Sequence, residues 1–375
     1  MKKHVNYPLL FLVAFIVGFS FLFFFTLSTP ASLQRFNKPN YYFSHQLIFG
    51  LLPALVLGFA AYKVSLKWLK KYAFWLVLFN ILALFLVFLP VIGSKLGGAT
   101  RWFNLGFFSV QPSEFLKITA ILYLSAWIAS RLPEGRVSGW KSTAKRGYHN
   151  IIYIFLPFVF FLGMITVALY LQRDASTLGI ISLTLLALYF YARTPLWHTL
   201  LIIFSGISFL LLIVRFEPYR LDRWLIFLNP NADPLGKGFQ LRQSLISLGS
   251  GGIFGQGMGM STQKFGFLPQ AMSDSIFAII GEEFGIMGGI ILIALFVLFF
   301  LLGIKISKNS HDRFASLIAI GVVLWITLQA FVNIASVAGI FPLAGIPLPF
   351  FSYGGSHLVV ELIGVGLLLN ISKNT

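Results

Sequence analysis

The sequence predicts an all-α, polytopic membrane protein of about ten transmembrane helices, with a long outer loop between the seventh and eighth helices. Two features of the composition predict this fold class: of the 375 residues, 58% are hydrophobic and only 10% are charged. Soluble globular domains carry roughly 25% charged residues. Because the deficit of charge extends along the whole chain, lipid is the expected solvent. We expect residues 1–375 to form a single transmembrane domain.

The apolar segments that are long enough to span a bilayer, at about 20 residues each, define the expected helices. They are residues 8–27, 45–62, 72–92, 112–130, 151–171, 175–192, 196–214, 276–303, 314–336 and 356–371. The first segment lacks the small-residue cleavage site of a signal peptide, so we expect it to be retained as a helix. A very short polar turn around Arg173 and Asp174 joins the fifth and sixth segments.

The basic residues predict the orientation of the chain. A net charge of +17 would suggest nucleic acid in a soluble protein. Here Lys and Arg cluster between apolar segments, so they indicate topology and contact with anionic membrane lipid, and no nucleic acid is expected. The positive-inside rule places both termini in the cytoplasm and residues 215–275 outside a cytoplasmic (inner) membrane. The absence of Cys excludes disulfides, thiol nucleophiles and Cys-based metal sites.

Charged residues within or beside the spans are candidate functional residues, because a charge at the bilayer centre costs roughly 2.5–3.5 kcal/mol on insertion scales. Glu114 and Lys117 lie three residues apart and share a helix face. They either lock two helices together or line a cavity that opens to the outer face. Asp174 stands at a helix boundary, where it either caps the next helix or serves the same cavity. The other intramembrane charges are Glu282, Glu283 and Glu361, and the role of Glu361 stays open. The six His residues are scattered, and we expect none to be catalytic.

The segment 215–275 is too long and too patterned for a simple connection. Residues 217–224 mix charge with Trp and Leu, and Leu241, Leu245 and Leu248 recur at helical spacing, so two helices in the membrane interface are expected. Glycines at 249, 251, 252, 255, 257 and 259 permit unusual backbone angles and close approach of a ligand. A flexible turn is the simpler alternative.

Asp274 is the only carboxylate between Asp233 and Glu282, at the point where the polar loop meets the membrane. A lone Asp before a helix is most often its N-cap, and spacing alone favours that interpretation. The functional alternative is a general base that takes a proton from a hydroxyl in a partly desolvated cleft.

Several motifs follow one another along nearly the whole chain. They lie at residues 97–102 (GGATRW), 111–117 (QPSEFLK), 223–238, 243–255, 268–274, 282–285 (EEFG) and 348–356 (LPFFSYGGS). In this order they resemble the SEDS family (shape, elongation, division, sporulation). That resemblance implies a peptidoglycan glycosyltransferase that polymerises lipid II at the outer face of the cytoplasmic membrane.

The resemblance also implies roles for individual residues. The catalytic Asp of the family falls on Asp274, the ion pair of its central cavity on Glu114 and Lys117, and the Asp after its fifth helix on Asp174. The leaving group is a lipid pyrophosphate, so a base and cations are needed rather than a strong acid. The candidate cations are Arg101, Lys117, Arg220, Arg223 and Lys264. Further polar groups expected at the cavity are Gln243, Ser244, Ser352 and Ser356. A divalent cation, Mg²⁺ or Mn²⁺, is a further expectation, although the sequence shows no metal-ligand cluster.

Departures from the family pattern fall close to the candidate site. Position 270 is Gln where the family often has Glu, residues 272–275 (MSDS) replace a common HTDF, and residues 172–177 (QRDAST) depart from QPDxGT. The stretch 261–264 and the MSDS ending favour the division (FtsW-like) branch and septal synthesis, with the elongation (RodA-like) branch as the alternative. The implied partners are lipid II, lipid-linked glycan, a class B penicillin-binding protein and division proteins.

Two other function classes remain open at this point. Intramembrane charges and the Gly/Pro-rich stretch 339–355 also fit a lipid II flippase or transporter, because broken helices line transport sites. Against that class, the two halves of the sequence show no repeat. A scaffold that only recruits a partner is the second alternative.

Overall fold

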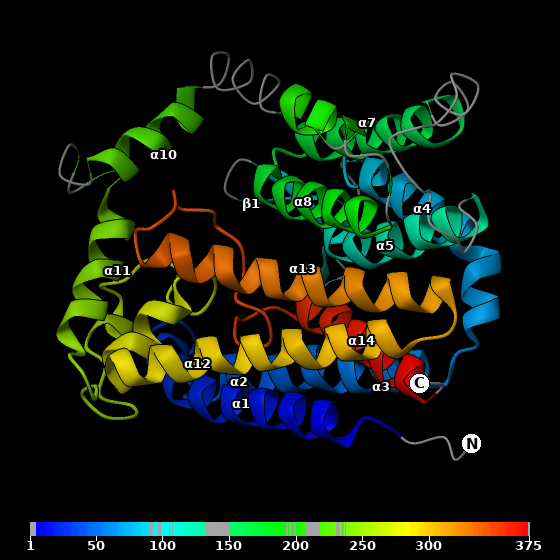
Figure 1. The fold of residues 1–375 in the computed structure, drawn as a ribbon. Helices are drawn as coiled ribbons and strands as arrows, with labels where there is room; N and C mark the ends of the chain where they lie inside the picture. Colours follow the sequence, from blue (N-terminus) through cyan, green and yellow to red (C-terminus); the bar gives the residue numbers. More distant parts are fainter. Residues whose placement is uncertain are drawn as a thin grey trace.

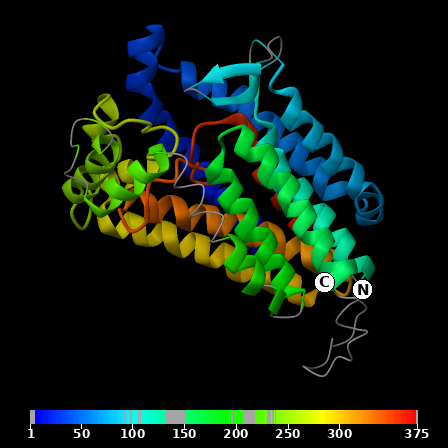
Figure 2. The same ribbon diagram turned by 90° about the horizontal axis from the view of Figure 1, so that it is seen from above.

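A computed structural model of the chain describes residues 5–89, 93–96, 99–104, 106, 108–131, 151–192, 194, 197–198, 200–206, 218–229, 233, 236 and 238–373. For residues 95, 96, 99 and 218–222 it describes the backbone alone. The long helices form a bundle in which α1 begins and α14 ends at the same end, whereas α10 and α11 lie at the other end (Figures 1 and 2). An even number of spans requires this placement of the termini.

The bundle consists of α-helices with two π-helical turns. In chain order they are α1 (Tyr7–Phe36), α2 (Tyr41–His45), η1 (Gln46–Leu51), α3 (Leu52–Lys63), α4 (Leu66–Leu86), α5 (Pro112–Arg131), η2 (Ile151–Phe155), α7 (Leu156–Leu171), α8 (Ala175–Tyr191), α12 (Ile276–Asn309), α13 (Arg313–Val337) and α14 (Gly355–Ser372). The segment predicted as the outer loop contains α10 (Pro218–Leu228), α11 (Phe239–Ser250) and the short η3 (Gln263–Phe265). The predicted helical, multi-pass membrane fold is confirmed.

The number of spans stays a prediction. Seven helical segments in the described part of the chain are long and apolar enough to cross a membrane. α5, which carries Glu114 and Lys117, and α8, with 17 residues, are not among the seven. Most of the predicted span 196–214 lies outside the described residues. Boundaries differ most at α1, which continues to Phe36, and at α4, which ends at Leu86. Apolar runs mark the lipid-embedded part of a helix, whereas backbone hydrogen bonds continue into polar sequence.

A small antiparallel sheet is an addition to the all-α prediction. It has the order β1-β2-β3, with strands β1 (Gly93–Leu96), β2 (Ala99–Asn104) and β3 (Ser109–Val110). Gly93 pairs with Phe103, which in turn pairs with Val110. Strands this short leave no alternating pattern that a sequence search detects. The sheet matters because it carries Arg101.

α12 is the longest helix, and it is broken near its start. Its 34 residues would extend about 51 Å at 1.5 Å each, more than the roughly 30 Å of a bilayer core. Gly285 has φ 67° and ψ −165°, a conformation that glycine readily adopts and that interrupts the helix. Residues 276–283 are buried, whereas large apolar side chains after Gly285, such as Ile286 and Met287, are exposed.

The glycine-rich stretch 249–259 is hydrogen-bonded to this break. The N–H groups of Ile286 and Met287 donate to the carbonyls of Gly252 and Ile253, at 2.9 and 3.1 Å. In return, the carbonyls of Glu282 and Glu283 accept from Gln256 and Gly257 N–H, both at 3.0 Å. The stretch therefore supplies the partners that the broken helix lacks, and the flexible-turn interpretation is wrong.

Candidate active site

Asp274 lies in the turn immediately before α12, and it does not cap that helix. The N-cap is Ser275, whose side chain makes no capping bond, so the cap interpretation of Asp274 is wrong. The carbonyl of Gln270 accepts from both Ser273 and Ser275 N–H, at 3.0 and 3.2 Å, which curls the turn. As a result the Asp274 carboxylate faces α11 rather than the first turn of α12. It accepts from Ser273 Oγ at Oδ1 (3.1 Å) and from Gln240 Nε2 at Oδ2 (3.4 Å).

The surroundings of Asp274 make it a better proton acceptor than an ordinary carboxylate. Burial raises the pKa of Asp274, and the bonds from its own backbone N–H, from Ser273 and from Gln240, together with the positive charge of Arg223, offset only part of that rise. A Cβ placed on Gly345 would lie 3.6 Å from Asp274 Oδ2 and 4.0 Å from Arg223 Nη2. The carboxylate and the guanidinium therefore flank one backbone position. Arg223 is exposed on α10 and donates to Leu343 O at 2.9 Å.

The turn that carries Asp274 is held from behind by α13 and by the segment 338–354. Asn333 Nδ2 donates to the carbonyls of Asp274 (2.8 Å) and Ile346 (2.7 Å). The hydroxyl of Ser352 donates to Ser273 O, and Tyr353 N–H donates to Met272 O at 2.7 Å. Ser352, a predicted cavity residue, thus contacts the turn directly. Three separate bonds fix the backbone on which the carboxylate stands, which is the preorganisation that a catalytic group requires.

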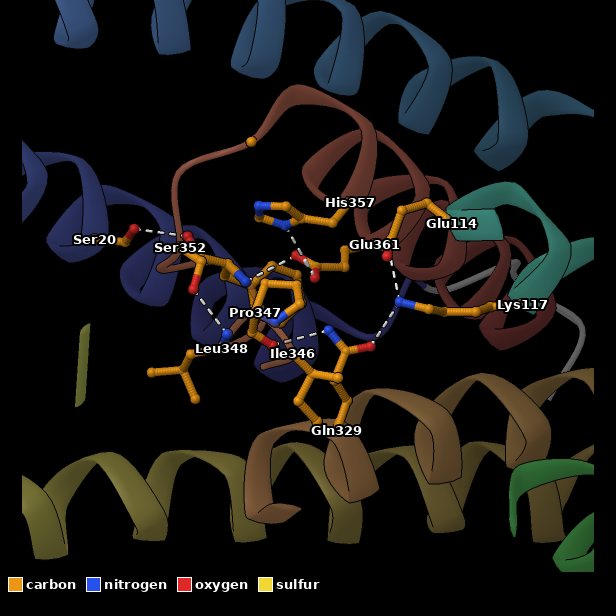
Figure 3. A network of polar contacts seen from close by, with 12 residues as sticks. Ser20, Glu114, Lys117, Gln329, Ile346, Pro347, Leu348, Ser352, His357 and Glu361 are labelled. Atoms are coloured by element: carbon orange, nitrogen blue, oxygen red, sulfur yellow. Dashed lines mark hydrogen bonds and ion pairs between the residues drawn. The ribbon is translucent and has the colours of Figure 1, made fainter. Parts of the chain in front are cut away.

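Glu114 and Lys117 form the predicted ion pair. Lys117 Nζ lies 2.7 Å from Glu114 Oε2, and both side chains are buried. Lys117 also donates to Gln329 Oε1 on α13 at 2.9 Å, and Gln329 Nε2 donates to Pro347 O at 3.0 Å (Figure 3). The pair therefore links α5 to α13 and to the segment that supports Asp274. The predicted cavity beside the pair stays a prediction.

Glu361 and His357 extend this buried network on α14. Glu361 Oε1 lies 3.3 Å from His357 Nδ1, and Glu361 Oε2 accepts from Phe350 N–H at 2.8 Å (Figure 3). Ser20 Oγ of α1 donates to Phe350 O at 2.6 Å. The role of Glu361, which the sequence left open, is to hold the segment 338–354 between α1 and α14.

Asp174 joins a second group of predicted residues at the start of α5 and α8. It caps α8 by accepting from Thr177 N–H at 3.4 Å, so the capping prediction is confirmed. Its Oδ2 also accepts from Ser113 Oγ (3.0 Å) and Gln111 Nε2 (3.3 Å). Arg101 Nη1 lies 3.8 Å from Asp174 Oδ1. Ser356 belongs to the same group, since its Oγ accepts from Gln111 N–H at 3.1 Å.

Lys264 lies in a third polar cluster, beneath the glycine-rich stretch. Its ammonium is buried and lies 3.0 Å from Glu283 Oε1. Glu283 also accepts from the N–H groups of Gly259 (2.7 Å) and Ser261 (3.3 Å). The role of Lys264 as a cation for pyrophosphate stays a prediction, although its charge is already matched by Glu283.

The remaining predicted residues lie on α10 and α11. Gln243 is half-buried and Ser244 is buried, with its hydroxyl donating to Gln240 O at 2.9 Å. Arg220 belongs to α10, but its side chain lies outside the described residues. Gln329 and Asn333 are site residues that the sequence did not single out, whereas Gln240 was expected only as a polar group on the second interfacial helix. Gln329 and Asn333 are spaced four apart in an apolar helix, a signal that could have marked a polar face on α13.

The expected divalent cation stays a prediction. The described residues contain no group of three or more His, Cys, Asp or Glu side chains that could hold a metal ion. These side chains therefore do not form a metal site by themselves. Mg²⁺ is commonly held by one or two carboxylates together with substrate phosphates, so an ion that arrives with a substrate needs no such group.

Comparisons with known proteins identify the family. Residues 7–375 match the family of FtsW, RodA and SpoVE, described as cell cycle protein. The chain belongs to this family. A probable peptidoglycan glycosyltransferase FtsW of Coxiella burnetii is 38% identical over 93% of the chain and 91% of the relative. A protein of the same description from Escherichia coli O157:H7 is 33% identical over 98% of the chain and 86% of the relative. The predicted SEDS membership is confirmed.

Two solved structures share the fold. One is described as structural coordination of polymerization and crosslinking by a peptidoglycan synthase complex. It superposes with a TM-score of 0.78 at 25% identity, and the match covers 98% of this chain and 97% of that one. The other, the rod shape determining protein RodA of Thermus thermophilus, has a TM-score of 0.69 at 24% identity, with coverages of 98% and 96%. The RodA likeness supports the fold alone.

Proposed function

We propose that this chain is a peptidoglycan glycosyltransferase of the division branch, which polymerises lipid II into glycan strands for the septal wall with Asp274 as its general base. The observation that carries the proposal is a carboxylate whose pKa burial raises, on a hydrogen-bonded turn directly before α12, a helix that begins at the end of the bundle opposite both termini (Figure 1). Relatives that match nearly the full chain carry the description of peptidoglycan glycosyltransferase.

The proposed reaction occurs at the outer face of the cytoplasmic membrane, with both termini in the cytoplasm. Asp274 accepts the proton of the sugar 4-hydroxyl of lipid II as that oxygen bonds to the anomeric carbon of the lipid-linked glycan. The bond from that carbon to the pyrophosphate breaks, and the lipid pyrophosphate leaves with the electron pair. Arg223, exposed beside the same Gly345 backbone as Asp274, is placed to attract the pyrophosphate.

The other networks hold this site in position. The ion pair of Glu114 and Lys117 acts through Gln329 and Pro347 on the segment that supports the Asp274 turn. A buried, hydrogen-bonded pair of this kind costs several kcal/mol when one partner is removed, because the other charge is left unpaired. We therefore assign Glu114 and Lys117 to positioning, not to proton transfer.

A comparison supports one of the proposed partners. A solved relative belongs to a complex whose description joins polymerisation to crosslinking. By extension, this chain works with a class B penicillin-binding protein that crosslinks its product, and with other division proteins.

Purified protein in detergent, supplied with lipid II, tests the proposal. Wild-type protein is expected to form glycan chains, and Asp274→Asn is expected to form none. Asp312→Asn is the matched control, because Asp312 caps α13 and Asn caps helices equally well. Glycan synthesis by Asp274→Asn at the wild-type rate would refute the assignment.

The same assay separates the rival functions. A flippase has no activity without a membrane barrier, so glycan formation in detergent excludes flipping as the sole activity. A scaffold would tolerate Asp274→Asn in a complementation assay, whereas the enzyme would not.

A further inference from the structure

α11 connects two carboxylates of the α12 segment. At its first turn, Gln240 Nε2 donates to Ser275 Oγ (3.0 Å) and to Asp274 Oδ2 (3.4 Å). Two turns later, Ser247 Oγ lies 3.0 Å from Ala278 O and 3.1 Å from Glu282 Oε2, and its proton can be donated to either oxygen. One face of a single helix therefore contacts both Asp274 and a buried carboxylate within α12.

The position of α11 against α12 is fixed by close contacts as well as by these bonds. A Cβ on Gly281 would lie 2.3 Å from Leu248 Cδ2, and a Cβ on Gly251 would lie 2.0 Å from Gly281 O. The contact at Gly251 is with backbone, so at that position only glycine permits the approach of the two segments. On the other side, Leu241 is buried, and Leu245 lies against Gly339. Gln240 is therefore placed by the packing of its whole helix.

The two oxygens of Asp274 have different partners. Oδ2 accepts from the Gln240 amide. Oδ1 lies near the hydroxyl of Ser273, which is also within reach of Gln270 Oε1 at 2.8 Å. A hydroxyl has one proton and donates it to one acceptor at a time. When Ser273 donates to Gln270, Oδ1 loses its side-chain donor, while the backbone N–H of Asp274 still bonds to the carboxylate.

We propose that Gln240 is a positioning residue that holds Oδ2 of Asp274, so that Oδ1 is the oxygen that accepts the proton of the attacking hydroxyl. The proposal rests on the proposed function, in which Asp274 is the base. It adds that the exchange of the Ser273 hydroxyl between Gln270 and Asp274 uncovers Oδ1. Gln270, at a position where the family often has Glu, thereby helps to determine which oxygen of Asp274 is uncovered.

The charges around Asp274 define what a change at Gln240 should do. Arg223 on α10 is the charged group that acts on Asp274 among the described residues. α11 contributes the neutral Gln240, α13 the neutral Asn333, and the segment 338–354 the backbone of Gly345. Removal of the amide donor should raise the pKa of Asp274, and an ammonium in its place should lower it.

The test compares Gln240→Leu and Gln240→Lys in the lipid II assay over a range of pH, with rates expressed per folded enzyme. The acidic limb of the pH–rate profile is expected to move to higher pH by about 0.5 to 1 unit in Gln240→Leu and to lower pH by a similar amount in Gln240→Lys. Gln256→Leu is the matched control, because its exposed amide bonds only Ser250 O and its limb should not move.

The outcomes separate the two proposals. Unmoved acidic limbs in both Gln240 variants, together with an inactive Asp274→Asn, would overturn the inference about Gln240 and leave the base assignment standing. An active Asp274→Asn would overturn the assignment of the base itself. If Gln240→Leu does not fold, Gln240→Asn carries the same prediction, because its shorter side chain does not reach Oδ2.

Discussion

Asp274 and Glu283 lie close together in the sequence, at the start of the same helical segment, yet their surroundings differ. Glu283 is buried and accepts from Lys264, Gly259 N–H and Ser261 N–H at 2.7 to 3.3 Å. Asp274 accepts bonds of 3.1 and 3.4 Å from neutral side chains and a further bond from its own backbone N–H. The Glu283 carboxylate is paired with a cation and holds the glycine-rich stretch against α12. The Asp274 carboxylate can accept a further hydrogen bond.

The difference shows how the protein separates a structural carboxylate from a reactive one. A buried carboxylate that accepts several bonds, one from a cation, has its charged form stabilised and is a weak base. A carboxylate whose charged form is disfavoured by burial and stabilised by few hydrogen-bond donors takes up a proton more readily. Four substitutions test this contrast, and they are taken in order of decreasing effect.

The largest effect is expected from Asp274→Asn. Loss of the base should lower glycan synthesis by at least about 100-fold. Because burial raises the pKa of Asp274, the folded protein binds this proton more tightly than the unfolded chain, and ionisation at higher pH destabilises the fold. The neutral Asn should therefore leave the melting temperature at neutral pH unchanged or higher. A variant that is inactive only because it melts early would contradict the role of Asp274 as a base.

Glu283→Gln should show the opposite pattern. It leaves the buried Lys264 without its counter-charge, at a cost of about 3–5 kcal/mol, so the melting temperature in detergent should fall. Glycan synthesis per folded molecule should stay near wild type. The double variant Lys264→Met/Glu283→Met should regain part of the lost stability, since no charge remains unpaired. A melting temperature equal to wild type in the single variant would argue against a structural role for Glu283.

Gly251→Ala tests the contact that sets α11 against α12. The added methyl group would lie 2.0 Å from the backbone oxygen of Gly281, so the end of α11 must shift away from α12, and with it Gln240. Activity should fall by several-fold, and the acidic limb of the pH profile should move up. Gly179→Ala in α8 is the control, because a Cβ there meets nothing within 4 Å and Ala favours a helix by about 0.5–1 kcal/mol. Equal behaviour of the two variants would show that the contact is unimportant.

The smallest effect is expected from Arg223→Gln. Its positive charge lowers the pKa of Asp274, so its removal should move the acidic limb upward, by less than the Gln240 changes because Arg223 is exposed. The Michaelis constant for lipid II should also rise, if the guanidinium attracts pyrophosphate. Arg242→Gln, an exposed Arg on α11, is the control. A downward shift of the acidic limb would contradict the expected influence of the Arg223 charge on Asp274.

Apolar length, charge and motif order predict much of this molecule from its sequence. They predict the helical membrane fold, the pairing of Glu114 with Lys117 and the cap at Asp174, because each depends on spacing within a helix or at its end. The role of Asp274 could not be predicted from spacing alone. An Asp beside the predicted start of a helix is a candidate cap because such boundaries are uncertain by a residue or two, and only the turn closed on Gln270 O directs its carboxylate to α11.

Other parts of the site depend on contacts between distant segments. The bond of Gln240 to Asp274 joins residues in different elements, and that of Asn333 to the Asp274 carbonyl does the same. The sequence did not mark Gly285 as a break of α12, since a glycine in a helix is commonly tolerated. The three short strands were not predicted, because they are too short to show an alternating pattern of apolar and polar residues.

The most direct test of the contrast is the protonation of Asp274 itself. Infrared difference spectra of wild type and Asp274→Asn, recorded across pH in detergent, isolate the band of this carboxyl group. Asp274 is expected to protonate well above the ordinary Asp pKa of about 3.9, at the same pH as the acidic limb of glycan synthesis. Protonation at or below that ordinary value, or at a pH unrelated to the rate, would contradict the assignment of Asp274 as the reactive carboxylate.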